Sequence, residues 1–142
     1  MGFRQDMTTA KQPPPGEYRL ILAPRFSQRE QAYRTLVRLE TTQLFSTFRY
    51  DLSVKEEQTG KSLRLRVLGL KTPQRSLPAS GPATFSREYV DMRGTYEVSV
   101  QGLDDKVNTF VFRISPKRIS LVKSPRSPFV DVVVDPTLTE TD

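Results

Sequence analysis

The chain has 142 residues, a length typical of one domain, and its 22 Lys and Arg outnumber 16 Asp and Glu to give a formal net charge of +6. It contains no histidine, cysteine or tryptophan, which excludes Ser-His-Asp and Cys-His nucleophilic centres, thiol redox chemistry, disulfides and nearly every zinc site. Because 36% of the residues are hydrophobic and 27% are charged, the composition still allows a packed core.

The two ends of the chain differ in composition from its middle. Residues 1–16 end in three prolines and a glycine and predict a flexible arm, whereas 136–142 predict a flexible acidic tail. We expect a single β-domain over 17–135, with no transmembrane segment, because no run approaches the ~20 apolar residues of a spanning helix. No apolar stretch follows Arg4 and Lys11 as in a signal peptide. With Met1 as the native start we expect a cytoplasmic protein; a trimmed start leaves an exported origin open.

Apolar and polar residues alternate through most of the chain, beginning with Tyr18, Leu20 and Leu22. Successive side chains of a strand point to opposite faces, so this pattern predicts strands with one buried face and one solvated face. The predicted strands lie near 17–23, 33–41, 46–55, 62–70, 84–90, 95–102 and 108–115, with two shorter ones near 118–122 and 129–134. We therefore predict an all-β fold, a single antiparallel sandwich of about seven to nine strands.

Turn residues punctuate these strands. Residues 57–61 contain Gly60, which predicts a hairpin with glycine in the left-handed conformation, and 102–106 predict a second turn. Residues 71–82 hold three prolines and predict a long loop, since proline cannot pair within a central strand.

Residues 28–41 support two interpretations. Ser27 and Glu30 have the spacing of a helix capping box, and Tyr33, Leu36 and Val37 fit one helical face. The same region also alternates with period two and is rich in β-branched residues, which favours a strand after a single helical turn.

The segment Asp91–Val98 resembles the entry to strand F of immunoglobulin-like and fibronectin-like domains. Gly94 and Tyr96 have the spacing of the tyrosine corner, in which the tyrosine hydroxyl bonds back to the preceding backbone. Val98 stands where antibody domains have cysteine, and Asp91 lies one residue farther from the tyrosine than is usual. The resemblance implies an immunoglobulin-like sandwich over about 17–115 and implies nothing about function.

Acidic pairs are the remaining candidates for catalysis or metal binding. Glu56-Glu57 and Asp104-Asp105 both fall in predicted turns, where water solvates the carboxylates and leaves them without a catalytic environment. Asp104 and Asp105 supply only part of a calcium shell, so a structural turn is the favoured interpretation and the metal question stays open. We therefore predict a non-enzyme with no catalytic residue, no metal site and no cofactor.

Basic residues alternate with core residues and are expected to project outward on one sheet face. The predicted binding residues on this outer face are Arg34, Leu36, Arg38, Arg49, Arg64, Arg66 and Arg113. We expect another protein, or a second copy of the chain, to bind this face or an unpaired strand edge. The alternative is a polyanion or nucleic acid held by the arginines. A third explanation for these arginines is cross-strand ion pairing with Glu40, Asp51 and Glu97.

Overall fold

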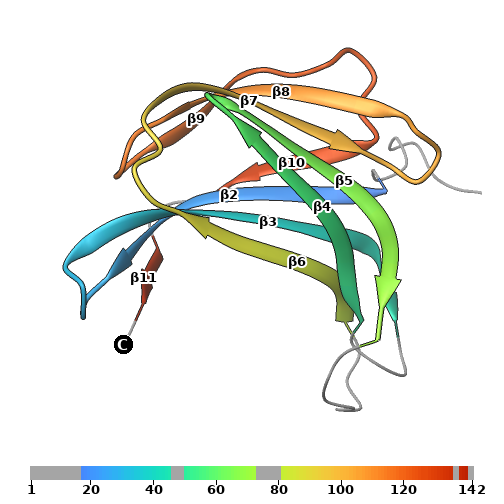
Figure 1. Ribbon diagram of the computed structural model, residues 1–142, viewed down its shortest axis with the longest axis horizontal. Helices are drawn as coiled ribbons and strands as arrows, with labels where there is room; N and C mark the ends of the chain where they lie inside the picture. The colour runs from blue at the N-terminus through green and yellow to red at the C-terminus, as the bar shows by residue number, and fades with distance from the viewer. Residues whose placement is uncertain (1–16, 46–49, 73–80, 136–137, 141–142) are drawn as a thin grey trace, which may run out of the picture.

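The computed structural model describes residues 17–45, 50–72, 81–135 and 138–140, which form one β-sheet without a helix (Figure 1). No helix able to cross a membrane occurs in these ranges. The strands are β2 (Tyr18–Ser27), β3 (Ala32–Phe45), β4 (Asp51–Thr59), β5 (Ser62–Lys71), β6 (Gly81–Tyr89), β7 (Gly94–Gln101), β8 (Val107–Ile114), β9 (Ile119–Lys123), β10 (Val130–Val134) and β11 (Leu138–Glu140).

Each predicted strand has a counterpart in the structure. Residues 28–31 form a turn in which the Ser27 hydroxyl accepts a hydrogen bond from the Glu30 amide, and β3 follows as a strand. The strand interpretation of 28–41 is therefore correct. The predicted arm at 1–16 and most of the proline-rich loop lie outside the described residues, while β11 occupies part of the predicted tail.

The predicted antiparallel sandwich is wrong. The strands form one mixed sheet in the order β10-β2-β3-β6-β4-β5-β7-β8-β9, which curls into a nearly closed barrel (Figure 1). Strand β10 pairs with β2 in parallel, and β5 pairs with β7 in parallel. Alternation along a strand reports only which face is buried, so it does not distinguish parallel from antiparallel neighbours or one curled sheet from two stacked ones.

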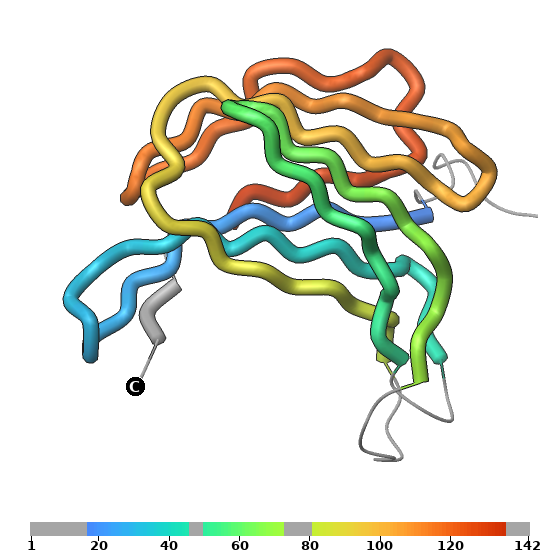
Figure 2. The backbone as a smooth tube through the Cα atoms, viewed as in Figure 1, coloured from blue at the N-terminus to red at the C-terminus, as the bar shows by residue number. Residues whose placement is uncertain are grey.

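The sheet divides into two walls. The first wall contains β10, β2, β3 and β6, and the second wall contains β4, β5, β7, β8 and β9. Within the second wall, the β4–β5 hairpin runs from the layer of β7, β8 and β9 toward the ends of β3 and β6 (Figures 1 and 2). Gly60 turns this hairpin with φ +59°, as the sequence predicted, because glycine enters the left-handed region without a Cβ clash.

Inward-facing side chains of both walls fill the barrel. Directly paired residues of neighbouring strands share a face, so Leu65 on β5 and Val100 on β7 both point inward. The fully buried large side chains are Phe110, Phe112, Leu20, Leu22, Leu39, Leu63, Leu65, Ile114, Val37, Val98, Val100 and Val130. The apolar phase of the predicted strands therefore forms the core.

The walls meet at two seams where backbone pairing is sparse in the described residues. Between β4 and β6, one residue pair, Asp51 with Thr84, is in register. Between β9 and β10, no strand pairing is present in the part of the chain described. The barrel is consequently almost closed, with little backbone pairing at either seam in the described residues.

Side chains close the β4–β6 seam. Glu56 lies opposite the buried Leu65 and therefore faces inward, although the sequence placed Glu56 in a solvated turn. The Tyr89 hydroxyl donates a hydrogen bond to Glu56 Oε2, and Arg87 Nη1 lies 3.0 Å from Glu56 Oε1. One carboxylate of β4 thus bridges to two side chains of β6.

We predict that Tyr89→Phe lowers the free energy of unfolding by about 1–2 kcal/mol, because Glu56 loses a donor at a half-enclosed site. Urea denaturation measures this loss. Glu57→Gln, on the exposed face of the same strand, is the control and should change stability by less than about 0.5 kcal/mol. In a double-mutant cycle, Tyr89→Phe and Glu56→Gln should be non-additive; full additivity would show that the two residues do not jointly close the seam.

Candidate functional site

The predicted binding residues lie on both walls of the barrel. Arg34, Leu36 and Arg38 lie on β3 of the first wall. Arg64 and Arg66 on β5 and Arg113 on β8 lie on the second wall, and Arg49 falls outside the described residues. The fold therefore brings the residues together in two groups.

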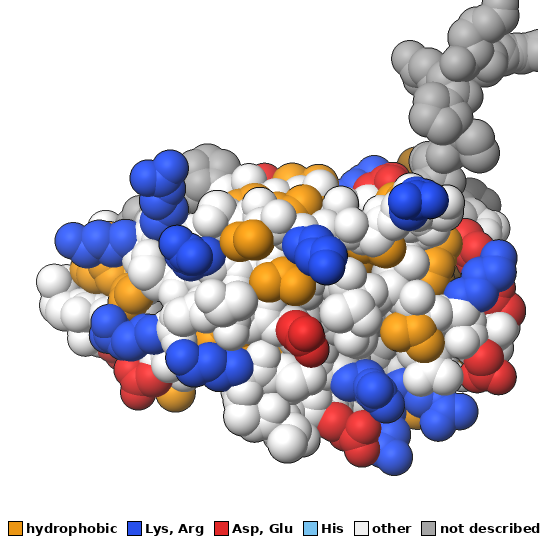
Figure 3. All heavy atoms as spheres, turned by 90° about the horizontal axis from the view of Figure 1, so that it is seen from above, with side chains coloured by type: hydrophobic (Ala, Val, Ile, Leu, Met, Phe, Trp, Pro, Cys, Tyr) orange, Lys and Arg blue, Asp and Glu red, His pale blue; other side chains and the backbone are white. Residues whose placement is uncertain are grey.

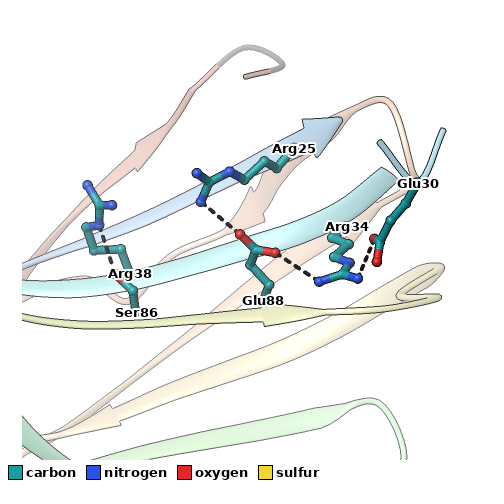
Figure 4. Close-up of polar contacts among 6 residues, drawn as sticks. All are labelled: Arg25, Glu30, Arg34, Arg38, Ser86 and Glu88. Atoms are coloured by element: carbon teal, nitrogen blue, oxygen red, sulfur yellow. Dashed lines mark hydrogen bonds and ion pairs between the residues drawn. The ribbon is translucent and has the colours of Figure 1, made fainter. Parts of the chain in front are cut away.

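On the first wall, acidic residues pair with most of the arginines, while Arg38 bonds to a neutral hydroxyl. Glu88 of β6 accepts hydrogen bonds from Arg25 Nη1 at 2.8 Å and from Arg34 Nη1 at 3.4 Å, and Arg34 also pairs with Glu30 (Figure 4). Arg38 Nε donates to the Ser86 hydroxyl at 3.0 Å (Figure 4).

A further ion pair extends this neutralisation. Arg19 and Glu40 lie 2.8 Å apart across β2 and β3, so the expected pairing with Glu40 is confirmed. Arg19–Glu40 and Arg34–Glu88 join adjacent strands, whereas Arg25–Glu88 reaches from β2 across β3 to β6; exposed pairs of this kind stabilise the sheet modestly. The first wall therefore offers little uncompensated positive charge to a partner.

Leu36 is buried despite its outward position on β3. Its side chain is 3% exposed, and its register partners are Ala23 on β2 and Glu88 on β6. Arg34 and Arg38 flank it along the strand, and the apolar stems of arginines cover neighbouring apolar surface. Leu36 thus packs within the sheet surface and is not available for a partner to contact.

On the second wall the arginines are exposed and none forms an ion pair with a described residue. Arg64 lies between Glu57 on β4 and Ser99 on β7, and Arg66 lies between Lys55 and Gln101. Figure 3 views the molecule from the side of β7, β8 and β9 and shows Lys and Arg side chains spread around a central group of apolar ones. Arg64, Arg66 and Arg113 are therefore left without an ion pair in the part of the chain described.

Strand β9 is an edge strand with exposed apolar side chains. It pairs only with β8 in the described residues, and Leu121 and Val122 are 41% and 56% exposed. Leu121 lies opposite the buried Phe112 and so points to the inner side, where the β9–β10 seam leaves it uncovered. Unpaired strand edges of this kind can accept another strand.

The segment around β9, residues 113–126, carries only positive charge. Its cations are Arg113, Lys117, Arg118, Lys123 and Arg126, all exposed, and no Asp or Glu occurs between 112 and 130. Lys117 Nζ lies 6.0 Å from the centroid of the Tyr33 ring. We call this segment the basic segment. The sequence contains the signal for this segment, because residues 113–130 include five Lys and Arg and no Asp or Glu.

Asp104 and Asp105 serve the β7–β8 turn. Asp104 Oδ1 accepts a hydrogen bond from the Lys106 backbone amide at 3.2 Å, and Asp105 Oδ1 accepts one from Gln101 Nε2 at 3.2 Å. Asp105 itself has the left-handed backbone angle φ +66°. No cluster of three carboxylates suited to a metal is present among the described residues. The turn interpretation accounts for both aspartates.

The tyrosine-corner candidates lie at the start of β7. Gly94 has φ +108° and Tyr96 is buried opposite Phe112. No described residue hydrogen-bonds the Tyr96 hydroxyl. The bond that defines a tyrosine corner is therefore not seen in the described part of the chain.

One end of the barrel contains a pocket that the sequence did not predict. Its volume is about 400 Å³, and it lies between the start of β2, the end of β3, the β4–β5 hairpin and the β7–β8 turn. Leu52 and Val67 form its apolar inner part, and Glu17 and Thr42 lie at its rim. The one sequence signal for this open end was Leu103, a leucine within an otherwise polar turn.

Tyr18 lines the open end and has a perturbed hydroxyl. Burial raises its pKa above the ordinary value of 10.0, and the negative charges of Glu17 and Asp104 raise it further. Its ring contacts Phe129 edge-on at 6.4 Å between centroids. No described residue hydrogen-bonds the hydroxyl, and Tyr18 is one of the residues that line the pocket.

We predict that stability falls as pH rises above 10.0, because unfolded chains ionise Tyr18 at its ordinary pKa whereas the folded protein resists ionisation. Tyr18→Phe should flatten this alkaline loss in urea titrations. Tyr33→Phe, which removes a half-buried hydroxyl elsewhere, is the control. An unchanged slope in Tyr18→Phe would contradict the assignment.

We predict that Leu36→Ala lowers the free energy of unfolding by about 2 kcal/mol, because a buried leucine loses its packing. Leu68→Ala, at an exposed leucine on β5, should cost less than about 0.5 kcal/mol. Thermal denaturation compares the two. Equal effects would show that Leu36 is not a packing residue.

Comparison with known proteins gives no relative. No family model, no curated protein and no solved structure matches the chain, so the immunoglobulin-like resemblance has no support from any of the three searches.

Proposed function

We propose that the chain is a non-catalytic protein-interaction module that binds an extended, acidic segment of a partner protein along the free edge of β9. The observation that carries the proposal is an unpaired edge strand, β9, set within the acid-free basic segment.

Backbone groups supply the affinity in this proposal. An edge strand leaves N–H and C=O groups unpaired on one side, and an added strand satisfies them with a regular hydrogen-bond ladder. Exposed Leu121 and Val122 would gain apolar contacts from the partner's side chains.

Charge selects the partner. Cations of the basic segment attract a carboxylate-rich strand and raise its association rate. The same cations oppose pairing of two copies through β9, because like charges repel and lysine on an edge strand discourages self-association. An acidic partner of a different sequence therefore fits this edge better than a second copy.

A second candidate function is polyanion binding by Arg64 and Arg66, which are exposed without an ion pair to any described residue. Phosphate contacts need such uncompensated cations. Base stacking needs exposed rings, however, and the described aromatic residues of this wall, Tyr96, Phe110 and Phe112, are all buried. The wall therefore suits an acidic protein strand better than single-stranded nucleic acid.

We predict that a short acetylated peptide of alternating Val and Glu binds the protein, whereas the matching Val and Lys peptide does not. Backbone amide resonances of β9 should shift in NMR titrations and gain protection from hydrogen exchange. The double charge reversal Arg113→Glu with Lys123→Glu should weaken binding about tenfold.

The matched control is Arg64→Glu with Arg66→Glu, which reverses the same number of exposed charges on the same wall away from β9. This variant should keep peptide binding. Loss of peptide binding in the control, or shifts outside β9, would contradict the proposal. If single-stranded DNA binds the protein with steep salt dependence and the control variant abolishes that binding, the polyanion function is the correct one.

A further inference from the structure

The open end of the barrel has the features of a small-molecule site. Ligand sites are commonly concave, mostly apolar and found at the mouths of β-barrels. The pocket's volume of about 400 Å³ lies within the range for small ligands. It is separate from β9, since the β7–β8 turn at the pocket and the β8–β9 turn lie at opposite ends of β8.

The inner part of the pocket is apolar. Leu52 and Val67 are core residues, while Leu70 is 49% exposed and Leu103 is 64% exposed. Leu70 pairs with Leu52 across the hairpin and therefore shares its inward face. Two large apolar side chains thus line a recess where they contact water, and an apolar ligand would remove that contact.

Polar groups gather at the rim on one side. Glu17 is the single charged side chain among the described residues that line the pocket. The Tyr18 hydroxyl has no hydrogen-bond partner among the described residues. The Glu17 carboxylate favours a ligand group that donates hydrogen bonds and disfavours an anion, and the Tyr18 hydroxyl can accept a second bond from such a group.

We infer that the open end binds a small, mainly apolar molecule that carries one hydrogen-bond-donating group, such as an amine, and that it excludes anions of the same shape. The apolar body lies against Leu52, Val67 and Leu70. The donor lies at the rim beside Glu17 and Tyr18.

The geometry of the hairpin supports this placement. The β4–β5 register shifts between Ser53 and Val54, and Gly69 on the facing strand has φ +143°, which a residue with a side chain rarely adopts. The irregularity sets Leu68 and Leu70 apart: both are exposed, but only Leu70 lines the pocket. The pair therefore offers a matched test of the site.

The test compares N-phenylnaphthylamine, a neutral amine, with anilinonaphthalenesulfonate, which has the same ring system and a negative charge. Both dyes gain fluorescence in an apolar site. We expect the neutral amine to bind with a single site and the sulfonate to bind at least about tenfold more weakly.

Variants of the full chain locate the site. Leu70→Gln should weaken binding of the amine about tenfold, while Leu68→Gln should leave it unchanged. Glu17→Gln should strengthen binding of the sulfonate relative to the amine. Amide protons of Val67 and Leu103 should shift in NMR spectra when the amine is added.

Several results would overturn the inference. These are absence of amine binding, equal binding of both dyes, or equal losses in Leu70→Gln and Leu68→Gln. Urea denaturation of both leucine variants verifies that they fold, so a loss of binding reports the pocket. The acidic peptide described above should bind with the amine present, which keeps the two sites distinguishable.

Discussion

The inward carboxylate of Glu56 connects the two walls of the barrel where their backbone pairing is sparse. Backbone pairing between β4 and β6 is limited to Asp51 with Thr84 in the described residues, so the two walls separate beyond that point unless side chains connect them. Glu56 holds Tyr89 and Arg87 of β6 at once. A partly enclosed charge requires such partners, because desolvation without compensation is costly. This link holds β4 of the second wall beside β6 of the first wall, at a seam that borders the shared core.

Incomplete closure explains where binding surfaces occur. A fully closed barrel has no strand edge, whereas in the described residues β9 pairs only with β8 and has a free outer edge, and one end of the barrel is open around Leu70. Charge follows the same division. Acidic partners pair with most arginines of the first wall, as at Glu88, whereas Arg64, Arg66 and Arg113 of the second wall have no ion pair with a described residue. The net charge alone did not reveal this asymmetry.

Sequence patterns predicted the strands and the core but not the arrangement of the sheet. Leu63, Leu65 and Val67 alternate as one buried face whether the neighbouring strand is parallel or antiparallel, so the pairing of β5 with β7 left no local signature. Leu36 fell on the outward phase, and only its neighbours on β2 and β6 bury it. The inward position of Glu56 was readable, since it continues the phase of Leu52 and Val54, but its turn-like neighbours suggested solvent.

The two proposed sites have opposite electrostatic preferences for a reason rooted in topology. Asp104 lies in the β7–β8 turn and Arg118 in the β8–β9 turn, at opposite ends of β8. The length of this one strand therefore separates the two charges. Glu17 joins Asp104 near the open end, where burial raises the pKa of Tyr18 and these two negative charges raise it further. The basic segment lies beyond the other end of β8. Under the two proposals, anionic partners would be drawn toward β9 and away from the pocket, so that one small barrel would bind a protein strand and a small molecule without competition.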